Sequence, residues 1–305
     1  MAGYNYQFHE GCAPPAQAEA APAFCPHPQA PSLLGQPLTS TRFALLDTES
    51  TGSDPTQAQV IELAARIWFL DPGHKSPYVL ESYVNPQCKI PPASMAVHHI
   101  TNRKVENAPL LGEVMPSFVD LIGNAIPVAY NSEFDRTILR GTPLHNRYWV
   151  DVYRLAMKTW SIGELNTDGF ALESFKQQEL RYWLGLRDVV GEAHRAAADI
   201  FVTGLVFQAA VSRFLGAGMP DDADRFLRWL EEPIMHKTIP FGPSAGKIPE
   251  DLEDYELRRA FDPANRMRES LVRFNVLDFL RPEMMRRALS ELPQAPRARR
   301  GGGVR

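Results

Sequence analysis

The chain opens its ordered part with apolar runs rich in β-branched and aromatic residues, the pattern of buried strands. Three such runs follow one another, at residues 42–47, 58–69 and 78–84. Two shorter runs, at 125–130 and 148–150, alternate with stretches of helical spacing at 113–122, 132–139, from Asp151 onward, and at 195–215. Three strands followed by strand–helix alternation predict an α/β fold, a mixed β-sheet flanked by helices.

Changes in composition along the chain predict four parts, a main domain and three flanking regions. Residues 1–40 hold many Ala and Pro and no Lys or Arg, which predicts a disordered tail; residues 41–215 form the main domain. Residues 216–292 predict a small C-terminal region, with a short helix capped by Asp221 and Asp222, a turn at 240–243 and a helix at 265–279. Residues 293–305 predict a basic disordered tail.

Bulk composition excludes several classes of protein. Hydrophobic residues make up 44% and charged residues 22% of the chain, as in folded soluble domains. No apolar run reaches the roughly 18 residues of a membrane span, and the first basic residue is Arg42, so we expect a cytoplasmic protein without a signal peptide. Three cysteines without a CxxC pair predict reduced thiols and no zinc site. A net charge of −4 is compatible with nucleic-acid binding if bound metal ions supply the positive charge.

A pair of acids accompanies the first predicted strand. Asp47 and Glu49 are two residues apart, so both carboxylates point to the same face. A DxE pair is weak evidence by itself, because Asp251/Glu253 and Asp254/Glu256 match it too. Those two pairs follow no apolar strand, and we expect a solvated acidic stretch there.

Two further elements complete a constellation of four acids and one histidine. Asp135 lies in the first turn of a helix after the 125–130 strand, and His194 precedes Asp199 by five residues at the start of the 195–215 helix. Mg²⁺ prefers carboxylate oxygens, and a pair of such ions can activate water and stabilise the leaving oxygen of a phosphodiester. A histidine titrates near neutral pH and can take the proton of the attacking water.

The three elements resemble motifs I, II and III of the DEDDh, DnaQ-like 3′→5′ exonuclease family: DTETTG, VAHNxxFD and HxAxxD. This chain reads Asp47-Thr-Glu-Ser-Thr-Gly52, Val128-Ala-Tyr-Asn-Ser-Glu-Phe-Asp135 and His194-Arg-Ala-Ala-Ala-Asp199. The similarity covers about residues 42–212, and the C-terminal region around 237–248 resembles the exonuclease X branch of the family. Gly242–Lys247 is one residue short of a Walker A loop, which argues against an NTPase.

The resemblance implies an RNase H-like fold and a role for each motif residue. The metal ligands would be Asp47, Glu49, Asp135 and Asp199, holding two Mg²⁺ that Mn²⁺ can replace. His194 would be the general base, and Thr48 and His98 would contact the substrate. The implied reaction releases 5′-mononucleotides from a single-stranded or frayed 3′ end, with DNA favoured. A 3′→5′ exoribonuclease, a polymerase proofreading subunit and a catalytically idle nucleic-acid-binding module are the alternatives. No feature of the sequence identifies a protein partner.

Overall fold

The computed structural model describes residues 28–71, 79–186 and 194–232, together with residues 234, 247, 251, 253, 255 and 256. Contacts between Cα atoms divide the chain into two units. The first runs to Thr159 and includes Lys176–Glu231; the second contains Trp160–Phe175 and the chain from Glu232 onward. The division into 41–215 and 216–292 stays a prediction. The turn at 240–243, the helix at 265–279 and the basic tail lie outside the described residues.

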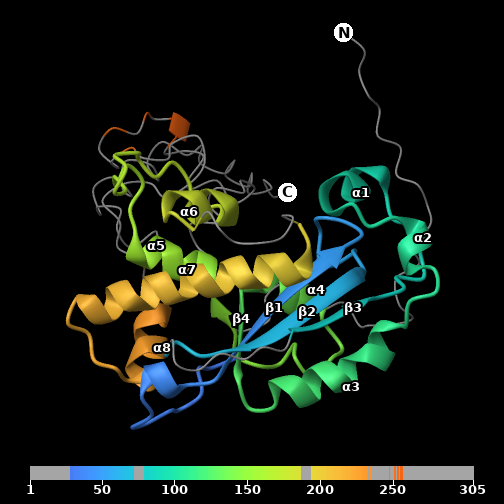
Figure 1. Ribbon diagram of the computed structural model, residues 1–305, viewed down its shortest axis with the longest axis horizontal. Helices are drawn as coiled ribbons and strands as arrows, with labels where there is room; N and C mark the ends of the chain where they lie inside the picture. The colour runs from blue at the N-terminus through green and yellow to red at the C-terminus, as the bar shows by residue number, and fades with distance from the viewer. Residues whose placement is uncertain are drawn as a thin grey trace, which may run out of the picture. The chain divides into compact units, whose positions relative to one another are not determined.

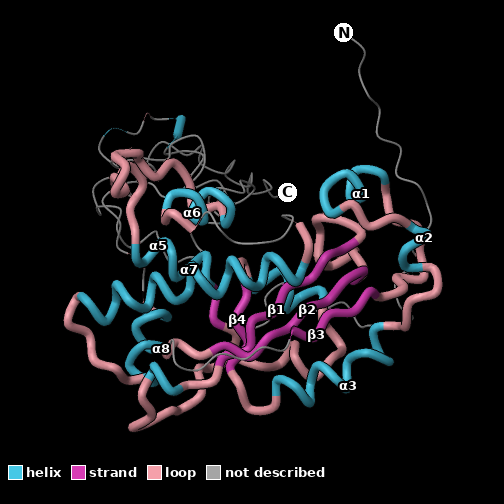
Figure 2. Tube along the Cα trace, in the orientation of Figure 1, coloured by secondary structure: helices cyan, strands magenta, loops and turns pink. Residues whose placement is uncertain are grey.

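The first unit is built on a five-stranded mixed sheet with the order β3-β2-β1-β4-β5 (Figures 1 and 2). Its strands are β1 (Phe43–Ser50), β2 (Val60–Trp68), β3 (Val79–Tyr83), β4 (Ile126–Ala129) and β5 (Val150–Asp151). The first three pair antiparallel, whereas β4 and β5 run parallel to β1. The predicted mixed sheet is therefore confirmed.

Helices cover both faces of this sheet (Figure 1). On β1, α3 and α7 pack against opposite faces. The described α-helices are α1 (Pro92–His98), α2 (Asn102–Val105), α3 (Leu111–Ile122), α4 (Ser132–Ile138), α5 (Val152–Thr159), α6 (Gln177–Trp183), α7 (Ala196–Gly216) and α8 (Ala223–Glu231). The sequence did not predict α1, α2 and α6. These helices have at most seven residues, too few for a clear periodic pattern. The residue preceding α4 is Asn131, which has a left-handed conformation.

Strand alternation sorts the β1 side chains between the two faces. Ala44 and Leu46 join the core against α3, while Phe43 packs edge-on against Phe207 of α7, with ring centroids 4.9 Å apart. The α7 helix lies close to the sheet because a glycine faces it: a Cβ on Gly204 would come 2.6 Å from Leu45 Cδ1. Ala44 and Leu46 thus face α3, whereas Phe43 and Leu45 face α7.

The segment before β1 departs from the predicted disordered tail. Residues 28–40 are described, and they include a short 3-10 helix, Leu38–Ser40, in which Leu38 is fully buried. The Thr39 backbone N–H and hydroxyl bond the Asp221 carboxylate at 2.9 and 2.6 Å. The composition of the segment predicted disorder because it gives no sign that Asp221, which precedes α8, bonds to this segment.

Two further expectations are tested by the described residues. Cys88 is disulfide-bonded, which contradicts the expected reduced thiol; the other two cysteines lie outside the described residues. Among the described helices, α7 is long and apolar enough to cross a membrane, but 56% of its most apolar window is buried inside the protein. Since α7 packs on β1 and β2, it has the character of a core helix.

Candidate active site

Strand β1 carries the first two acids of the predicted site. Asp47 and Glu49 both lie within the strand, which runs to Ser50 and thus beyond the predicted residues 42–47, and both are partly exposed. Like Phe43 and Leu45, they occupy odd-numbered positions of the strand. Their side chains therefore project to the face that α7 covers. The apolar half of β1 therefore holds the strand in the core, while its acidic half brings two carboxylates to the start of α7.

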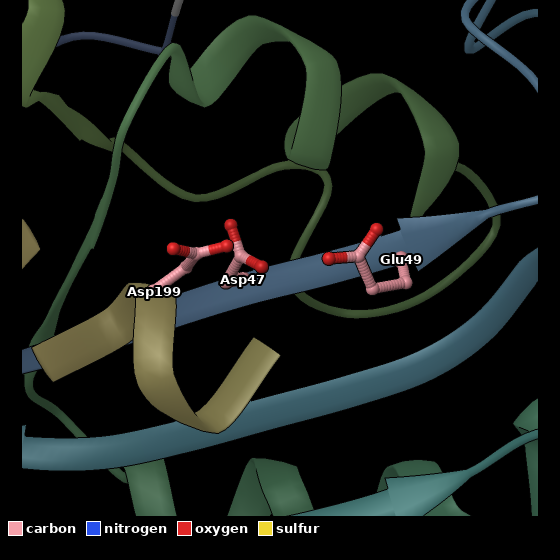
Figure 3. Close-up of side chains that lie close together, drawn as sticks. All are labelled: Asp47, Glu49 and Asp199. Atoms are coloured by element: carbon pink, nitrogen blue, oxygen red, sulfur yellow. The ribbon is translucent and has the colours of Figure 1, made fainter. Parts of the chain in front are cut away.

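A third carboxylate joins them from the first turn of α7. One oxygen each from Asp47, Glu49 and Asp199 lies within 4.8 Å of the others, an arrangement that could hold a metal ion. Figure 3 shows the Asp47 and Asp199 side chains next to each other, with Glu49 farther along the same strand. Carboxylate oxygens are the donors that Mg²⁺ and Mn²⁺ prefer, so the donor set fits a hard divalent cation.

Asp135, the fourth predicted ligand, lies outside that group of three. It is buried in α4, and its Oδ1 accepts a hydrogen bond from the Thr48 hydroxyl at 2.8 Å. It still acts on the site electrostatically, because its charge helps to raise the pKa of Asp47. Thr48, predicted to contact substrate, is thus a buried link between β1 and the Asp135 carboxylate in this structure.

His194 is exposed and lies two residues before the first residue of α7. Its backbone has a positive φ of 62°, which is uncommon for a residue other than glycine. Its N–H donates to Asp199 Oδ2 at 2.9 Å, and this bond supports the unusual backbone conformation. His194 is therefore tied through its own backbone to one of the grouped carboxylates, at the entrance of the helix as predicted.

Burial and mutual repulsion raise the pKa values of the two β1 acids. Partial burial, followed by the charges of Asp135, Asp199 and Glu49, raises the pKa of Asp47 well above its usual value. Burial and the charge of Asp199 raise the pKa of Glu49 to about 8. Clustered carboxylates that resist ionisation are those that a divalent cation would stabilise in their charged form.

The remaining two acids are shifted in the same direction, with hydrogen bonds opposing the shift. Burial raises the pKa of Asp135 to about 7, and the Thr48 hydroxyl lowers it in part. Burial likewise raises the pKa of Asp199, while the His194 backbone N–H and the nearby imidazole lower it. The ionised form of all four predicted ligands is therefore destabilised when no cation is bound.

Glu62 is a site residue that the sequence analysis missed. It is fully buried in β2, and it accepts hydrogen bonds from Arg195 Nη2 at 2.7 Å and from the backbone N–H of Ala196, the first residue of α7, at 3.0 Å. Arg195 Nη2 also donates to the Tyr83 hydroxyl at 2.7 Å and pairs with Glu81 at 3.2 Å. The signal was present: Glu62 lies in a mostly apolar strand, and a carboxylate requires a partner when it is buried.

His98, predicted to contact substrate, is a buried residue at the end of α1. Its Nδ1 accepts a hydrogen bond from the Ile100 backbone N–H at 3.0 Å, and its buried Nε2 has no hydrogen-bond partner among the residues that the structure describes. Burial lowers its pKa. The substrate role of His98 stays a prediction.

One of the other acidic pairs also behaves differently from expectation. Glu256 is 4% exposed, and Lys247 Nζ bonds both of its carboxylate oxygens at 2.8 and 2.9 Å. Glu256 therefore does not belong to a solvated acidic stretch. It is buried in an ion pair, and nothing in the described residues connects it with the β1 acids.

Comparison with known families identifies the group to which this constellation belongs. The model of the exonuclease family that includes RNase T matches residues 45–207, more than half of the chain. The chain belongs to this DEDDh 3′→5′ exonuclease family. The matched range contains all three motifs that the sequence analysis identified.

Curated relatives of this exonuclease domain are similar over different shares of their length. The DNA polymerase III subunit epsilon-like protein of Rhodobacter capsulatus is 37% identical over 109 residues, which cover 36% of this chain and 16% of that protein. Exodeoxyribonuclease 10 of Escherichia coli K12 is 26% identical over 212 residues, covering 69% of this chain and 84% of the relative. The DNA polymerase III subunit epsilon of Treponema pallidum is 27% identical, covering 56% and 76%.

Solved structures share the fold of this exonuclease. The zinc-bound complex of E. coli exonuclease I with single-stranded DNA matches with a TM-score of 0.50 and 16% identity, covering 62% of this chain and 42% of that one. Exonuclease X in complex with 5′ overhanging duplex DNA covers 61% of this chain and 99% of its own, with a TM-score of 0.43 and 22% identity. The family match, the five-stranded mixed sheet and the exonuclease I structure together confirm the RNase H-like fold implied by the motifs.

Proposed function

We propose that the protein is a metal-dependent 3′→5′ exonuclease that removes 5′-mononucleotides from the 3′ ends of DNA. The observation that carries this proposal is the group formed by Asp47, Glu49 and Asp199, whose oxygens come from two elements and lie within 4.8 Å of one another. The substrate class rests on exodeoxyribonuclease 10, the relative of which the chain covers 84%. We propose that the DNA substrate has a single-stranded or frayed 3′ end. We also propose that the enzyme is cytoplasmic.

Two Mg²⁺ ions, which Mn²⁺ can replace, would be held by the four carboxylates of the family motifs. These are the group of Asp47, Glu49 and Asp199, together with Asp135. When bound, such ions stabilise negative charge on the attacking and leaving oxygens of the phosphodiester. Asp47 is central to this set, since the charges of Asp135, Asp199 and Glu49 all act on it.

His194 supplies the proton acceptor in this proposal. A water oxygen attacks the terminal phosphorus, the imidazole takes the water proton, and the bond from phosphorus to the 3′ oxygen of the preceding nucleotide breaks. The 3′ oxygen then takes up a proton from solvent, which leaves a shortened strand with a free 3′ hydroxyl and one 5′-mononucleotide. The exposed position of His194 at the edge of the carboxylate group suits this task.

The test is cleavage of single-stranded DNA and RNA of equal sequence, each labelled at its 5′ end, with Mg²⁺ or with EDTA. We expect a ladder of shortened DNA products that depends on Mg²⁺, and no products from Asp47→Asn. Faster degradation of RNA than of DNA would show that RNA, and not DNA, is the preferred substrate. Binding without cleavage of either strand would favour the idle nucleic-acid-binding module.

A further inference from the structure

Asp199 receives hydrogen bonds on both of its carboxylate oxygens. The His194 backbone N–H donates to Oδ2 at 2.9 Å, and the Gln178 side-chain amide donates to Oδ1 at 3.1 Å. Gln178 comes from the first turn of α6, a helix that packs on α7 (Figure 1). The orientation of this carboxylate is therefore determined by two donors from outside the helix that carries it.

The amide of Gln178 is itself oriented by a third residue. Arg181 Nη1 donates to Gln178 Oε1 at 3.2 Å, and a guanidinium has only donors to offer. The amide oxygen must therefore face Arg181, which leaves the NH₂ group to face Asp199. Arg181 is 7% exposed, so its position is restricted by packing.

A second glutamine separates this effect from simple attachment of the helix. Gln177 donates to the backbone carbonyl of Asp199 at 2.9 Å and to the Thr203 hydroxyl at 2.8 Å. It joins α6 to α7 without touching the carboxylate. Gln177 thus attaches α6 to α7, whereas the adjacent Gln178 bonds the Asp199 carboxylate.

We propose that Gln178, held by Arg181, is a positioning residue that orients Asp199 for a divalent cation and thereby raises the metal affinity of the site. This inference rests on the metal site of the proposed function. A carboxylate held in place before the ion arrives loses less conformational freedom on binding, and partners that orient a metal ligand are typically worth 10–100-fold in affinity. Gln178 does not touch the reacting atoms in this account.

The experiment is a calorimetric titration of the full chain with Mn²⁺ in the absence of nucleic acid. We expect Gln178→Met, which keeps the side-chain length and removes the amide, to bind Mn²⁺ about 10-fold more weakly than the wild type. Gln177→Met is the matched control: we expect a lower melting temperature but Mn²⁺ affinity within twofold of the wild type. In cleavage assays, Gln178→Met should need about 10-fold more Mn²⁺ for half-maximal rate and approach the wild-type rate at saturation.

The outcomes separate this inference from the function on which it rests. Melting curves in EDTA report whether each variant folds, and Gln178→Asn, whose amide is one methylene too short, provides a second folded protein with the same expected loss. Wild-type affinity in both Gln178 variants, or equal losses in the Gln177 and Gln178 variants, would overturn the positioning role. Absence of Mn²⁺ binding by the wild type would overturn the metal site itself, and the positioning role with it.

Discussion

The His194 backbone N–H donates to the Asp199 carboxylate at 2.9 Å, so the turn that carries the proposed base is bonded to one proposed metal ligand. His194 has a positive φ of 62° in this turn. A substitution at His194 can therefore act in two ways, by removing the imidazole or by relaxing the turn that leads into α7.

His194→Ala distinguishes these two effects. The four carboxylates remain, so we expect metal-dependent DNA binding to persist while single-turnover cleavage falls by roughly 10²–10⁴, the usual worth of a positioned proton acceptor. The measurement is single-turnover cleavage by folded protein at saturating Mg²⁺. Near-wild-type rates in the variant would remove His194 from the chemistry.

The helix α7 brings its acidic first turn to β1 because the rest of the helix can lie close to the sheet. Gly204, two turns after the first residues of the helix, faces Leu45 and the Trp68 ring, both of which a Cβ would meet at 3.0 Å or less. At the start of the helix, Glu62 accepts a hydrogen bond from the Ala196 backbone N–H and forms an ion pair with Arg195. The helix is thus held by close packing in its middle and by a buried carboxylate at its start.

Gly204→Ala tests the close approach. Overpacking a core costs about 1–3 kcal/mol, and the better helix propensity of alanine returns up to about 1 kcal/mol, so we expect a net loss on the order of 1 kcal/mol in the free energy of unfolding. Gly216→Ala, in the last turn of the same helix with nothing near its added Cβ, is the control and should leave stability unchanged or slightly higher. Urea unfolding measures both; a Gly204 variant as stable as the control would contradict the packing account.

Four acids with raised pKa values make the stability of the metal-free protein depend on pH. Burial raises the pKa of Glu49 to about 8 and the pKa of Asp135 to about 7, against ordinary values of 4.5 and 3.8. Between the ordinary and the raised values the unfolded chain loses these protons first. The folded state then binds more protons than the unfolded state, so stability falls as pH rises through this window.

The corresponding measurement is the melting temperature at pH 5, 6.5 and 8, in EDTA and in millimolar Mg²⁺. We expect the melting temperature in EDTA to fall toward pH 8, and Mg²⁺ to oppose that fall because the cation stabilises the ionised carboxylates. At a hundredfold excess over its Kd, the ion would contribute about 2.7 kcal/mol. Glu49→Gln, with one titrating group fewer, should show a shallower fall in EDTA. A metal-free melting temperature that rises across this range would contradict the clustering of the four charges.

The sequence alone determined the strands of the sheet, the long helices, the three motifs and the family. These features are local: strand and helix periods are written in neighbouring residues, and Asp47, Asp135 and His194 each lie at a recognisable position of one element. Even so, the first strand was predicted three residues short, because the acids at its end resemble a loop when burial is unknown.

Only the tertiary structure decided which side chains support those motifs. Glu62 and Ala196 are 134 residues apart, Thr48 and Asp135 are 87 apart, and Gln178 reaches Asp199 from a helix that the sequence did not predict. A glutamine or threonine carries no local mark of the partner it will meet. Such contacts arise when packing removes water from two elements at once, because each buried polar group must then find its hydrogen bond in the neighbour that the fold supplies.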